Sequence, residues 1–323
     1  MVLYPTKPPF ASAAADKAVA KAGRSCIILL KCARMEALQM ETRPDFGFSS
    51  GKTLGVILIY FVLFVVGELA SSLLFDLIFS VVTLPDSALY QIPRYLGSLA
   101  LTWLLFWLYT VKVLRLEMRS FGMTARIKPW CAVCAVLLPA GVICALLPFG
   151  SLEPGGHSWA ETALIAAASA AMAVKSGITE EMLFRGYIMR LVEARWGRAR
   201  AVLLPSLLFG LVHLTSMTAF SPAGVALLAV GGTLVGVMFS LVAYSGGSVA
   251  CSAAVHAVWN FAIISDMLHI AAPGGSWGAP VYELALDSGN IFVTGGEFGV
   301  EVSLAAIAGY ALVSAFAAAK RPR

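Results

Sequence analysis

Charged residues are scarce in this sequence. Asp, Glu, Lys and Arg together make up 13% of the 323 residues, whereas 59% are hydrophobic. Because soluble domains contain about 25% charged residues, this composition excludes an ordinary soluble protein and predicts an integral membrane protein. The net charge of +5 then reports on orientation, because basic residues concentrate in cytoplasmic loops. We therefore predict the lipid bilayer, and not nucleic acid, as a partner of this chain.

Two common cysteine and histidine signatures are also missing. The sequence lacks the regular cysteine spacing of a disulfide framework, and Cys131-x-x-Cys134 has no second pair beside it. We interpret these two cysteines as packing residues of an apolar segment. The sequence contains no His-Glu-x-x-His, which excludes the metalloprotease helix that binds zinc through two histidines on one face.

Apolar segments of membrane-spanning length follow one another from Lys52 onward. We predict eight transmembrane helices, at 54–82, 95–113, 129–149, 160–190, 201–219, 223–243, 248–268 and 299–319. Basic residues gather before the first helix and in every second connection, whereas the other connections contain a single one, Arg94. The positive-inside rule therefore predicts that both termini are cytoplasmic.

The predicted fold is an all-α bundle of about eight transmembrane helices, preceded by an extension. Residues 1–50 are the N-terminal cytoplasmic extension, poorly ordered or amphipathic, and residues 51–323 are the membrane-embedded domain. The glycine-rich segment 269–298 is expected to be a surface loop or a re-entrant one. We place the protein as a multi-pass protein in the cytoplasmic membrane of a bacterium.

Two carboxylates and a guanidinium lie inside the fourth predicted helix, in Glu180-Glu181-x-x-x-Arg185. Charged groups in hydrocarbon cost a few kcal/mol each, so they are rarely retained without a function. Glu181 and Arg185 are four residues apart, which places them on one helix face as an ion pair. Glu180 points about 100° away and is left free to act as a general base. A further intramembrane charge, Lys175, could pair with Glu68 or line the mouth of a cavity.

Two later apolar segments each contain a histidine. Phe209 lies four residues before His213, and Asn260 lies four residues after His256, so each pair shares a helix face. Counted from the nearest cytoplasmic helix end, His213 lies roughly 18–20 Å into the membrane and His256 roughly 12 Å, against roughly 14 Å for Glu181. A lone histidine in an apolar helix is more often a hydrogen-bonded core residue. Three polar motifs at one depth instead favour a shared cavity, which we expect to open toward the cytoplasm.

These motifs resemble those of the CPBP family of intramembrane proteases, also called Abi, which groups CAAX prenyl proteases with bacteriocin-processing enzymes. The residues that carry the resemblance are Glu180-Glu181-Met182-Leu183-Phe184-Arg185, Phe209-Gly210-Leu211-Val212-His213 and His256-Ala257-Val258-Trp259-Asn260. The resemblance covers roughly residues 160–320. It implies an intramembrane endopeptidase for CAAX-type or leader-peptide processing, whose substrate is a peptide or protein, lipidated or membrane-bound.

The resemblance also implies a role for each matching residue. Glu180 would activate a water together with His213, and His256 and Asn260 would stabilise the oxyanion. Structural support of the site would come from Glu181, Arg185 and Phe209. The cofactor is expected to be none, or zinc. A zinc ion would use Glu180, His213 and His256 as ligands and keep one position open for water.

Two other functions are compatible with intramembrane carboxylates and histidines. A proton-coupled secondary transporter would use these groups as a proton relay. Such transporters are often built from repeated halves, but the polar groups here gather in the fourth, fifth and seventh predicted helices without a counterpart in the first three. A non-catalytic bacteriocin-immunity or scaffold protein would keep the charged motif as a structural clasp.

Overall fold

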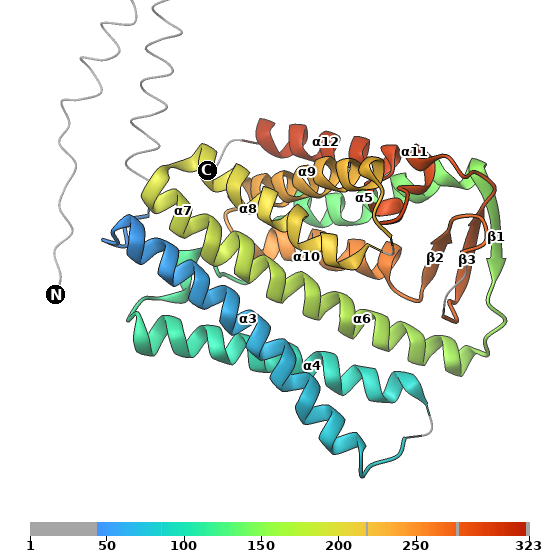
Figure 1. The fold of residues 1–323 in the computed structure, drawn as a ribbon, viewed down its shortest axis with the longest axis horizontal. Helices are drawn as coiled ribbons and strands as arrows, with labels where there is room; N and C mark the ends of the chain where they lie inside the picture. The colour runs from blue at the N-terminus through green and yellow to red at the C-terminus, as the bar shows by residue number, and fades with distance from the viewer. Residues whose placement is uncertain (1–43, 85, 218, 276–277, 321–323) are drawn as a thin grey trace, which may run out of the picture. The chain divides into compact units, whose positions relative to one another are not determined.

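The computed structural model describes residues 44–84, 86–217, 219–275 and 278–320. Phe46–Arg323 forms one compact unit, which is mostly helical (Figure 1). Residues 1–43 of the predicted N-terminal extension lie outside the described residues.

Helices occur wherever a transmembrane segment is predicted. The long helices are α3 (Ser50–Phe79), α4 (Ser87–Trp107), α5 (Pro129–Leu146), α6 (Trp159–Glu181), α7 (Met189–Trp196), α8 (Arg198–Val212), α9 (Pro222–Gly246), α10 (Val249–Trp259) and α12 (Leu304–Ala319), with a short α11 (Ile291–Thr294) before the last. A π-helical segment, η4 (Met182–Ile188), joins α6 to α7, so that Trp159–Trp196 runs as one helical stretch of 38 residues.

Six of these helical stretches, within the described part of the chain, are long and apolar enough to cross a membrane. The predicted helices at 248–268 and 299–319 are shorter in the structure, where they occupy Val249–Ile264 and Leu304–Ala319. At 1.5 Å per residue, 16 residues extend roughly 24 Å, less than a hydrocarbon layer of about 30 Å. The polar ends of both predicted segments belong instead to turns and a strand.

Helix ends follow local capping chemistry. The Ser158 side chain accepts from the backbone N–H of Glu161, and the Glu161 carboxylate accepts from the backbone N–H of Ser158. This capping box satisfies two of the free N–H groups at the start of α6. Gly247, with φ +73°, ends α9 in the left-handed conformation, which glycine adopts without steric cost.

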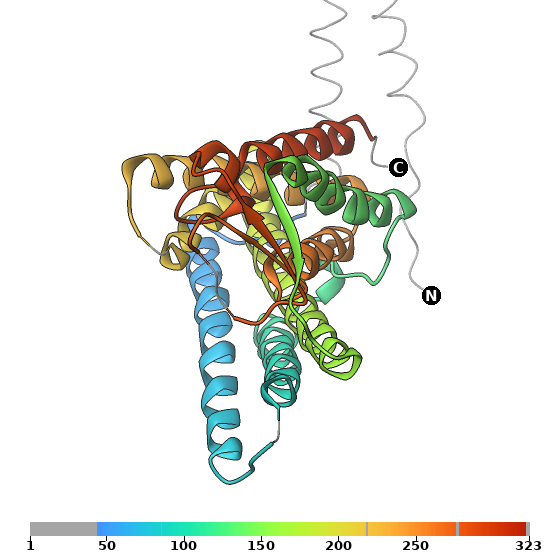
Figure 2. The ribbon, with the colours of Figure 1, turned by 90° about the vertical axis from the view of Figure 1, so that its right-hand side faces the viewer.

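A small sheet corrects the all-α prediction. It contains β1 (Gly150–Pro154), β2 (Leu268–Ala271) and β3 (Tyr282–Leu286) in the order β1-β3-β2. β1 pairs antiparallel and β2 parallel to β3, with Leu152 opposite Leu284. Segment 269–298 is therefore not a simple surface or re-entrant loop, since it supplies most of β2 and all of β3. Figure 1 shows the sheet at one end of the helical unit, and in Figure 2 that end faces the viewer.

Helices α8 and α9 approach each other closely through small residues. A Cβ atom at Gly232 would lie 2.8 Å from the Cα of Gly210, and one at Gly236 would lie 2.7 Å from the Cα of Ser206. Both contacts are shorter than any ordinary side-chain contact, so the two backbones can meet only because these positions are glycine.

Ion pairs connect the first two helices to each other and to α6. Lys175 Nζ lies 2.5 Å from a carboxylate oxygen of Glu68, and the other oxygen of Glu68 accepts from the Ser98 hydroxyl at 2.8 Å. Arg94 on α4 pairs with Asp76 on α3. Lys175 is therefore the partner of Glu68, and it does not line the cavity described below.

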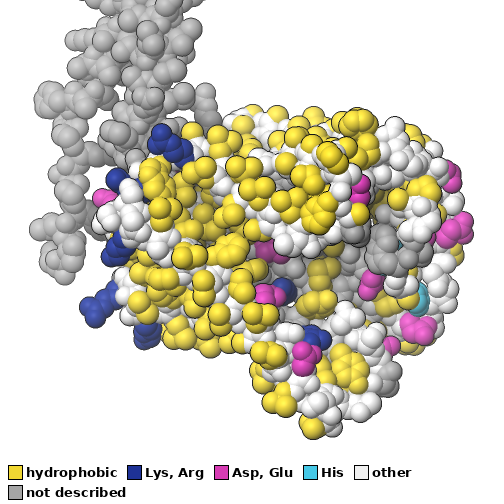
Figure 3. Space-filling model, in the orientation of Figure 1, with side chains coloured by type: hydrophobic (Ala, Val, Ile, Leu, Met, Phe, Trp, Pro, Cys, Tyr) yellow, Lys and Arg dark blue, Asp and Glu magenta, His cyan; other side chains and the backbone are white. Residues whose placement is uncertain are grey.

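The two ends of the unit differ in charge. Figure 3 shows most of the Lys and Arg side chains at the end where α3 begins and α7 ends, whereas Asp and Glu side chains gather at the opposite end, beside the sheet. We call these the basic end and the sheet end. The difference follows from the sequence, because the basic connections all fall on the side of the bundle where α3 begins.

Candidate active site

A cavity of about 300 Å³ lies inside the bundle. It is enclosed by α6, α8, α9, α10 and the turn before α12. Glu180, His213, His256 and Asn260, which the sequence predicts as the reacting groups, all line it. The structure thus brings four polar side chains from three helices to one space. Phe209 lines the same space as an aromatic wall.

The charged pair next to the cavity is completely buried. Arg185 Nη1 donates to Glu181 Oε1 at 2.9 Å, and neither side chain is exposed at all. Arg185 Nη2 also donates to the backbone carbonyl of Gly236 at 3.1 Å, and its guanidinium lies 4.5 Å from the centre of the Phe209 ring. The pair therefore joins α6 to α8 and α9, and Phe209 supports the guanidinium as well as His213.

His256 is held from two sides. Its Nδ1 lies 3.1 Å from Glu181 Oε1, and its ring stacks on Phe239 with a centroid distance of 4.7 Å. Because a carboxylate only accepts hydrogen bonds, Nδ1 is the donor and Nε2 is directed toward Glu180, whose Oε2 is 3.9 Å away. Glu181 thus orients His256 as well as pairing with Arg185. The contact with His256 joins two helices, so spacing along one helix cannot predict it.

His213 lies where α8 gives way to the short 3-10 turn η5 (His213–Ser216). Its Nδ1 lies 2.6 Å from the backbone carbonyl of Phe209. A carbonyl can only accept, so Nδ1 carries a proton, and Nε2 is the ring nitrogen left for the cavity. The residue four positions earlier therefore sets the tautomer of His213 through its backbone.

Asn260 begins η6 (Asn260–Ile264), a π-helical segment directly after α10. It lines the cavity four residues beyond His256, so both side chains face the same space. The segment η4 likewise begins directly after Glu181. Short π-helical segments are frequent at functional sites. Here η4 lies between α6 and α7, and η6 ends the helix that begins with α10.

Glu301 is a cavity residue that sequence reasoning missed. It lies in the turn η7 (Val300–Val302) and lines the cavity. Trp259 Nε1 donates to its carboxylate at 3.4 Å, and the Tyr310 hydroxyl donates to its backbone carbonyl at 2.9 Å. A signal was present, because Glu301 is an acid inside the predicted helix 299–319, as Glu180 is in its own helix.

The cavity's donor groups do not converge in the way that a metal requires. Throughout the described residues, no group of three or more His, Cys, Asp or Glu side chains is placed to hold an ion. The predicted ligand set Glu180, His213 and His256 therefore does not fit a zinc ion in this arrangement, and we derive no step through one.

The contact between α6 and α10 positions Glu180 relative to His256, and it depends on Gly177. A Cβ atom at Gly177 would lie 2.8 Å from the Ala257 nitrogen and 2.9 Å from the Ala253 oxygen. Both are backbone atoms of α10, so the two helices would have to separate.

We therefore expect Gly177→Ala to lower the hydrolytic rate on the order of 10²-fold, because a shift of about 1 Å in catalytic groups has an effect of that size. The measurement is the initial rate of peptide cleavage by the purified variant. Gly141→Ala is the matched control, since a Cβ at that helical glycine meets nothing within 4 Å, and its rate should equal that of the parent. An unchanged rate for Gly177→Ala would show that the close contact does not set the geometry of the site.

Fold and cavity together define an integral membrane protein with a polar site inside an apolar helical bundle. Residues 161–262 match the family model described as type II CAAX prenyl endopeptidase, Rce1-like. This part of the chain is an Rce1-like domain of the CPBP family, and it contains Glu180, His213, His256 and Asn260. Because the family is one of proteases, the match supports an endopeptidase in general. Searches of curated proteins and of solved structures found no match to the chain.

Proposed function

We propose that this protein is an intramembrane endopeptidase in which Glu180 activates a water molecule for attack on a peptide bond. The observation that carries the proposal is the meeting of Glu180, His213, His256 and Asn260 around one polar cavity inside an apolar bundle. Polar groups buried in a membrane are costly and tend to mark functional sites. The match of residues 161–262 to a protease family supports hydrolysis over other chemistry.

The first step is attack of water on the carbonyl carbon. Glu180 is in contact with the cavity, with 21% of its side chain exposed, and it takes a proton from the water as the oxygen–carbon bond forms. His213 holds the water through Nε2, the nitrogen left free by its bond to the Phe209 carbonyl. Removal of the proton makes the water a sufficient nucleophile.

The second step is collapse of the tetrahedral intermediate. His256 acts here as an imidazolium, with Nδ1–H bonded to Glu181, so that its Nε2–H and the Asn260 amide donate to the oxygen that becomes negative. The carbon–nitrogen bond then breaks, and the protonated Glu180 gives its proton to the leaving amine. Three further residues act through the groups they hold. Glu181 fixes His256, Arg185 fixes the start of η4, and Phe209 fixes His213.

The proposal is tested with purified protein and a peptide library, with products identified by mass spectrometry. We expect cleavage by the parent protein and its loss in His213→Ala. If cleavage were unaffected by this substitution, the proposed mechanism would be wrong. Proton-coupled uptake by vesicles that contain the protein, without any cleavage, would favour the transporter instead.

Chelation separates water activation by Glu180 from activation by zinc. We expect the purified protein to retain its activity after dialysis against a strong chelator, with the remaining metal measured by mass spectrometry. The physical reason is that the donor groups of the cavity do not converge on one point. Loss of activity that added zinc restores would replace the proposed mechanism by a metal-dependent one.

A further inference from the structure

We propose that Glu301, Trp259 and Tyr310 form a subsite that binds a basic side chain of the substrate. The substrate class is then a polypeptide with a lysine or an arginine close to the peptide bond that is cleaved. This inference rests on the proposed function for its substrate. The subsite itself rests on a carboxylate in the cavity, the aromatic rings beside it and the pairing of the cations around it.

Glu301 brings a carboxylate to the cavity that no step of the proposed reaction uses. Its side chain lines the same space as Glu180 and His213. Within the described residues, this carboxylate receives one hydrogen bond, from Trp259 Nε1 at 3.4 Å. A carboxylate offers about four lone-pair sites, so most of the capacity of Glu301 to accept hydrogen bonds is unused. A lysine ammonium or an arginine guanidinium supplies several donors and no acceptor, which matches this capacity.

Aromatic rings form the walls next to Glu301. Trp259 on α10 and Tyr310 on α12 both line the cavity, and their ring centroids lie 5.2 Å apart. Phe298, three residues before Glu301, also lines it and packs edge-on against His213. Aromatic rings attract ammonium and guanidinium groups, most strongly where water is excluded. The methylene groups of a lysine or an arginine pack on the same apolar surface, so carboxylate and rings together suit a basic side chain.

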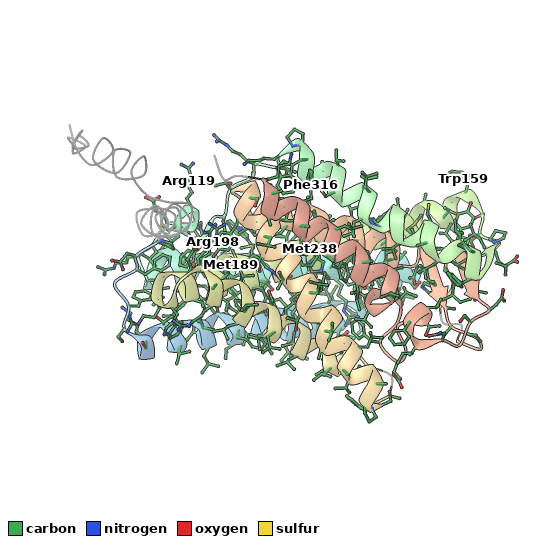
Figure 4. The ribbon with its side chains drawn as sticks, turned by 90° about the horizontal axis from the view of Figure 1, so that it is seen from above. Arg119, Trp159, Met189, Arg198, Met238 and Phe316 are labelled. Atoms are coloured by element: carbon green, nitrogen blue, oxygen red, sulfur yellow. The ribbon has the colours of Figure 1, made fainter. Side chains whose placement is uncertain are left out.

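The subsite is held in place by the packing of α12. The Tyr310 hydroxyl donates to the backbone carbonyl of Glu301 at 2.9 Å, so α12 fixes the turn η7 that carries the carboxylate. Figure 4 shows α12, marked by Phe316, beside α9, marked by Met238, and the two helices are in contact. Trp259 is 3% exposed and Tyr310 is 1% exposed, so packing fixes both rings. A site that is ordered in advance loses little entropy when its ligand binds.

The lysine and arginine side chains around the site already have partners. Among the described residues that line the cavity, none is Lys or Arg. Arg185 is bound to Glu181 and to the Gly236 carbonyl. Lys175 pairs with Glu68 outside the cavity. A buried carboxylate without a cation is costly, and a substrate that expels water from the site raises this cost. A basic side chain of the substrate supplies the charge that Glu301 lacks.

The subsite lies close to the bond that is cleaved. Trp259 directly precedes Asn260, whose amide donates to the oxyanion in the proposed mechanism. The whole cavity has a volume of about 300 Å³, which leaves room for only a short piece of chain. The basic side chain therefore belongs to a residue next to the cleaved bond or a few positions from it.

Pairs of peptides that differ in one residue test the subsite. A peptide that the purified protein cleaves is made with lysine, and separately with norleucine, at each position near the cleaved bond in turn. Norleucine has a similar length and no charge. At one position we expect kcat/KM to be at least about tenfold higher for lysine, because close charge pairs in interfaces are coupled at least this strongly. Equal values at every position would overturn the proposal.

Variants of Glu301 assign the preference to its carboxylate. Glu301→Gln should lose the preference for lysine, whereas Glu301→Asp keeps the charge and should retain part of it. The two peptides are compared within each variant, so a general loss of activity cancels, and a purely structural role of Glu301 would leave their ratio unchanged. Glu153→Gln removes an exposed acid on β1 and, as the matched control, should keep the parental ratio. A preference that persists in Glu301→Gln would also overturn the proposal.

Binding separates a failure of the subsite from a failure of the proposed function. Two model peptides rich in leucine and alanine, one with a central lysine and one with norleucine in its place, are titrated into the purified protein by calorimetry. We expect the parent protein to bind the lysine peptide more tightly, and Glu301→Gln to bind both equally. Equal binding to the parent, or no binding of either peptide, would overturn the subsite. Absence of cleavage together with the expected binding would overturn only the proposed function.

Discussion

Glu180→Gln is expected to lower the rate of peptide hydrolysis by about 10²–10⁴-fold, the range that a positioned general base contributes. Glutamine keeps the size of the side chain and loses only its ability to take a proton. The nearest basic group to the Glu180 carboxylate is His256 Nε2, 3.9 Å away. Removal of the charge on Glu180 therefore breaks no close ion pair. The measurement is kcat/KM for a peptide that the parent protein cleaves.

The control for Glu180→Gln is the same substitution at an acid outside the cavity. Glu153 lies on β1 at the exposed sheet end, so Glu153→Gln should keep the activity of the parent. Thermal unfolding of both variants in detergent should match that of the parent. Hydrolysis by Glu180→Gln at the parental rate would remove Glu180 from the chemistry and leave it a structural role.

Arg185→Met is expected to destabilise the protein by about 3–5 kcal/mol, because it leaves the carboxylate of Glu181 buried without its cation. Both side chains are fully buried, and Arg185 also loses its bond to the Gly236 carbonyl. The loss is measured as a lower thermal unfolding temperature of the purified protein, or as loss of folded protein during purification.

Two variants show whether burial is the cause. Arg94→Met removes the cation of the pair with Asp76, whose side chains are 37% and 57% exposed, so its cost should stay below about 1 kcal/mol. The double variant Glu181→Gln and Arg185→Met should regain part of the lost stability, because no unpaired charge remains. If Arg94→Met were as destabilising as Arg185→Met, the loss of a buried partner would not be the explanation.

Local patterns in the sequence predicted which polar side chains line the cavity. The pair Glu181 and Arg185 depends on one helical turn, and so does the placement of His256 with Asn260 on one face. Hydropathy placed the helices, because a membrane requires long apolar stretches that satisfy their own backbone groups. These features need only neighbours within the same helix, and the sequence contains that information directly.

Contacts between distant segments were not predictable in the same way. β1 and β3 contain only five residues each, too few to show the alternation of side chains that indicates a strand. Five α-helices lie between them in the sequence. The bond between Glu181 and His256 joins α6 to α10, and Glu301 reaches the cavity only through the turn that precedes α12. Each depends on how helices pack, which spacing along one helix does not determine.

The packed segment Met182–Ile188 also has a consequence for the cell's ion gradients. A polar cavity that reaches the middle of a bilayer would conduct protons if a chain of water molecules continued to the other side. Here seven consecutive buried residues, one of which is Arg185 in its ion pair with Glu181, interrupt any such chain. The protein can therefore admit water to one half of the membrane while the membrane remains an electrical insulator, which a transporter could not do without opening this same segment.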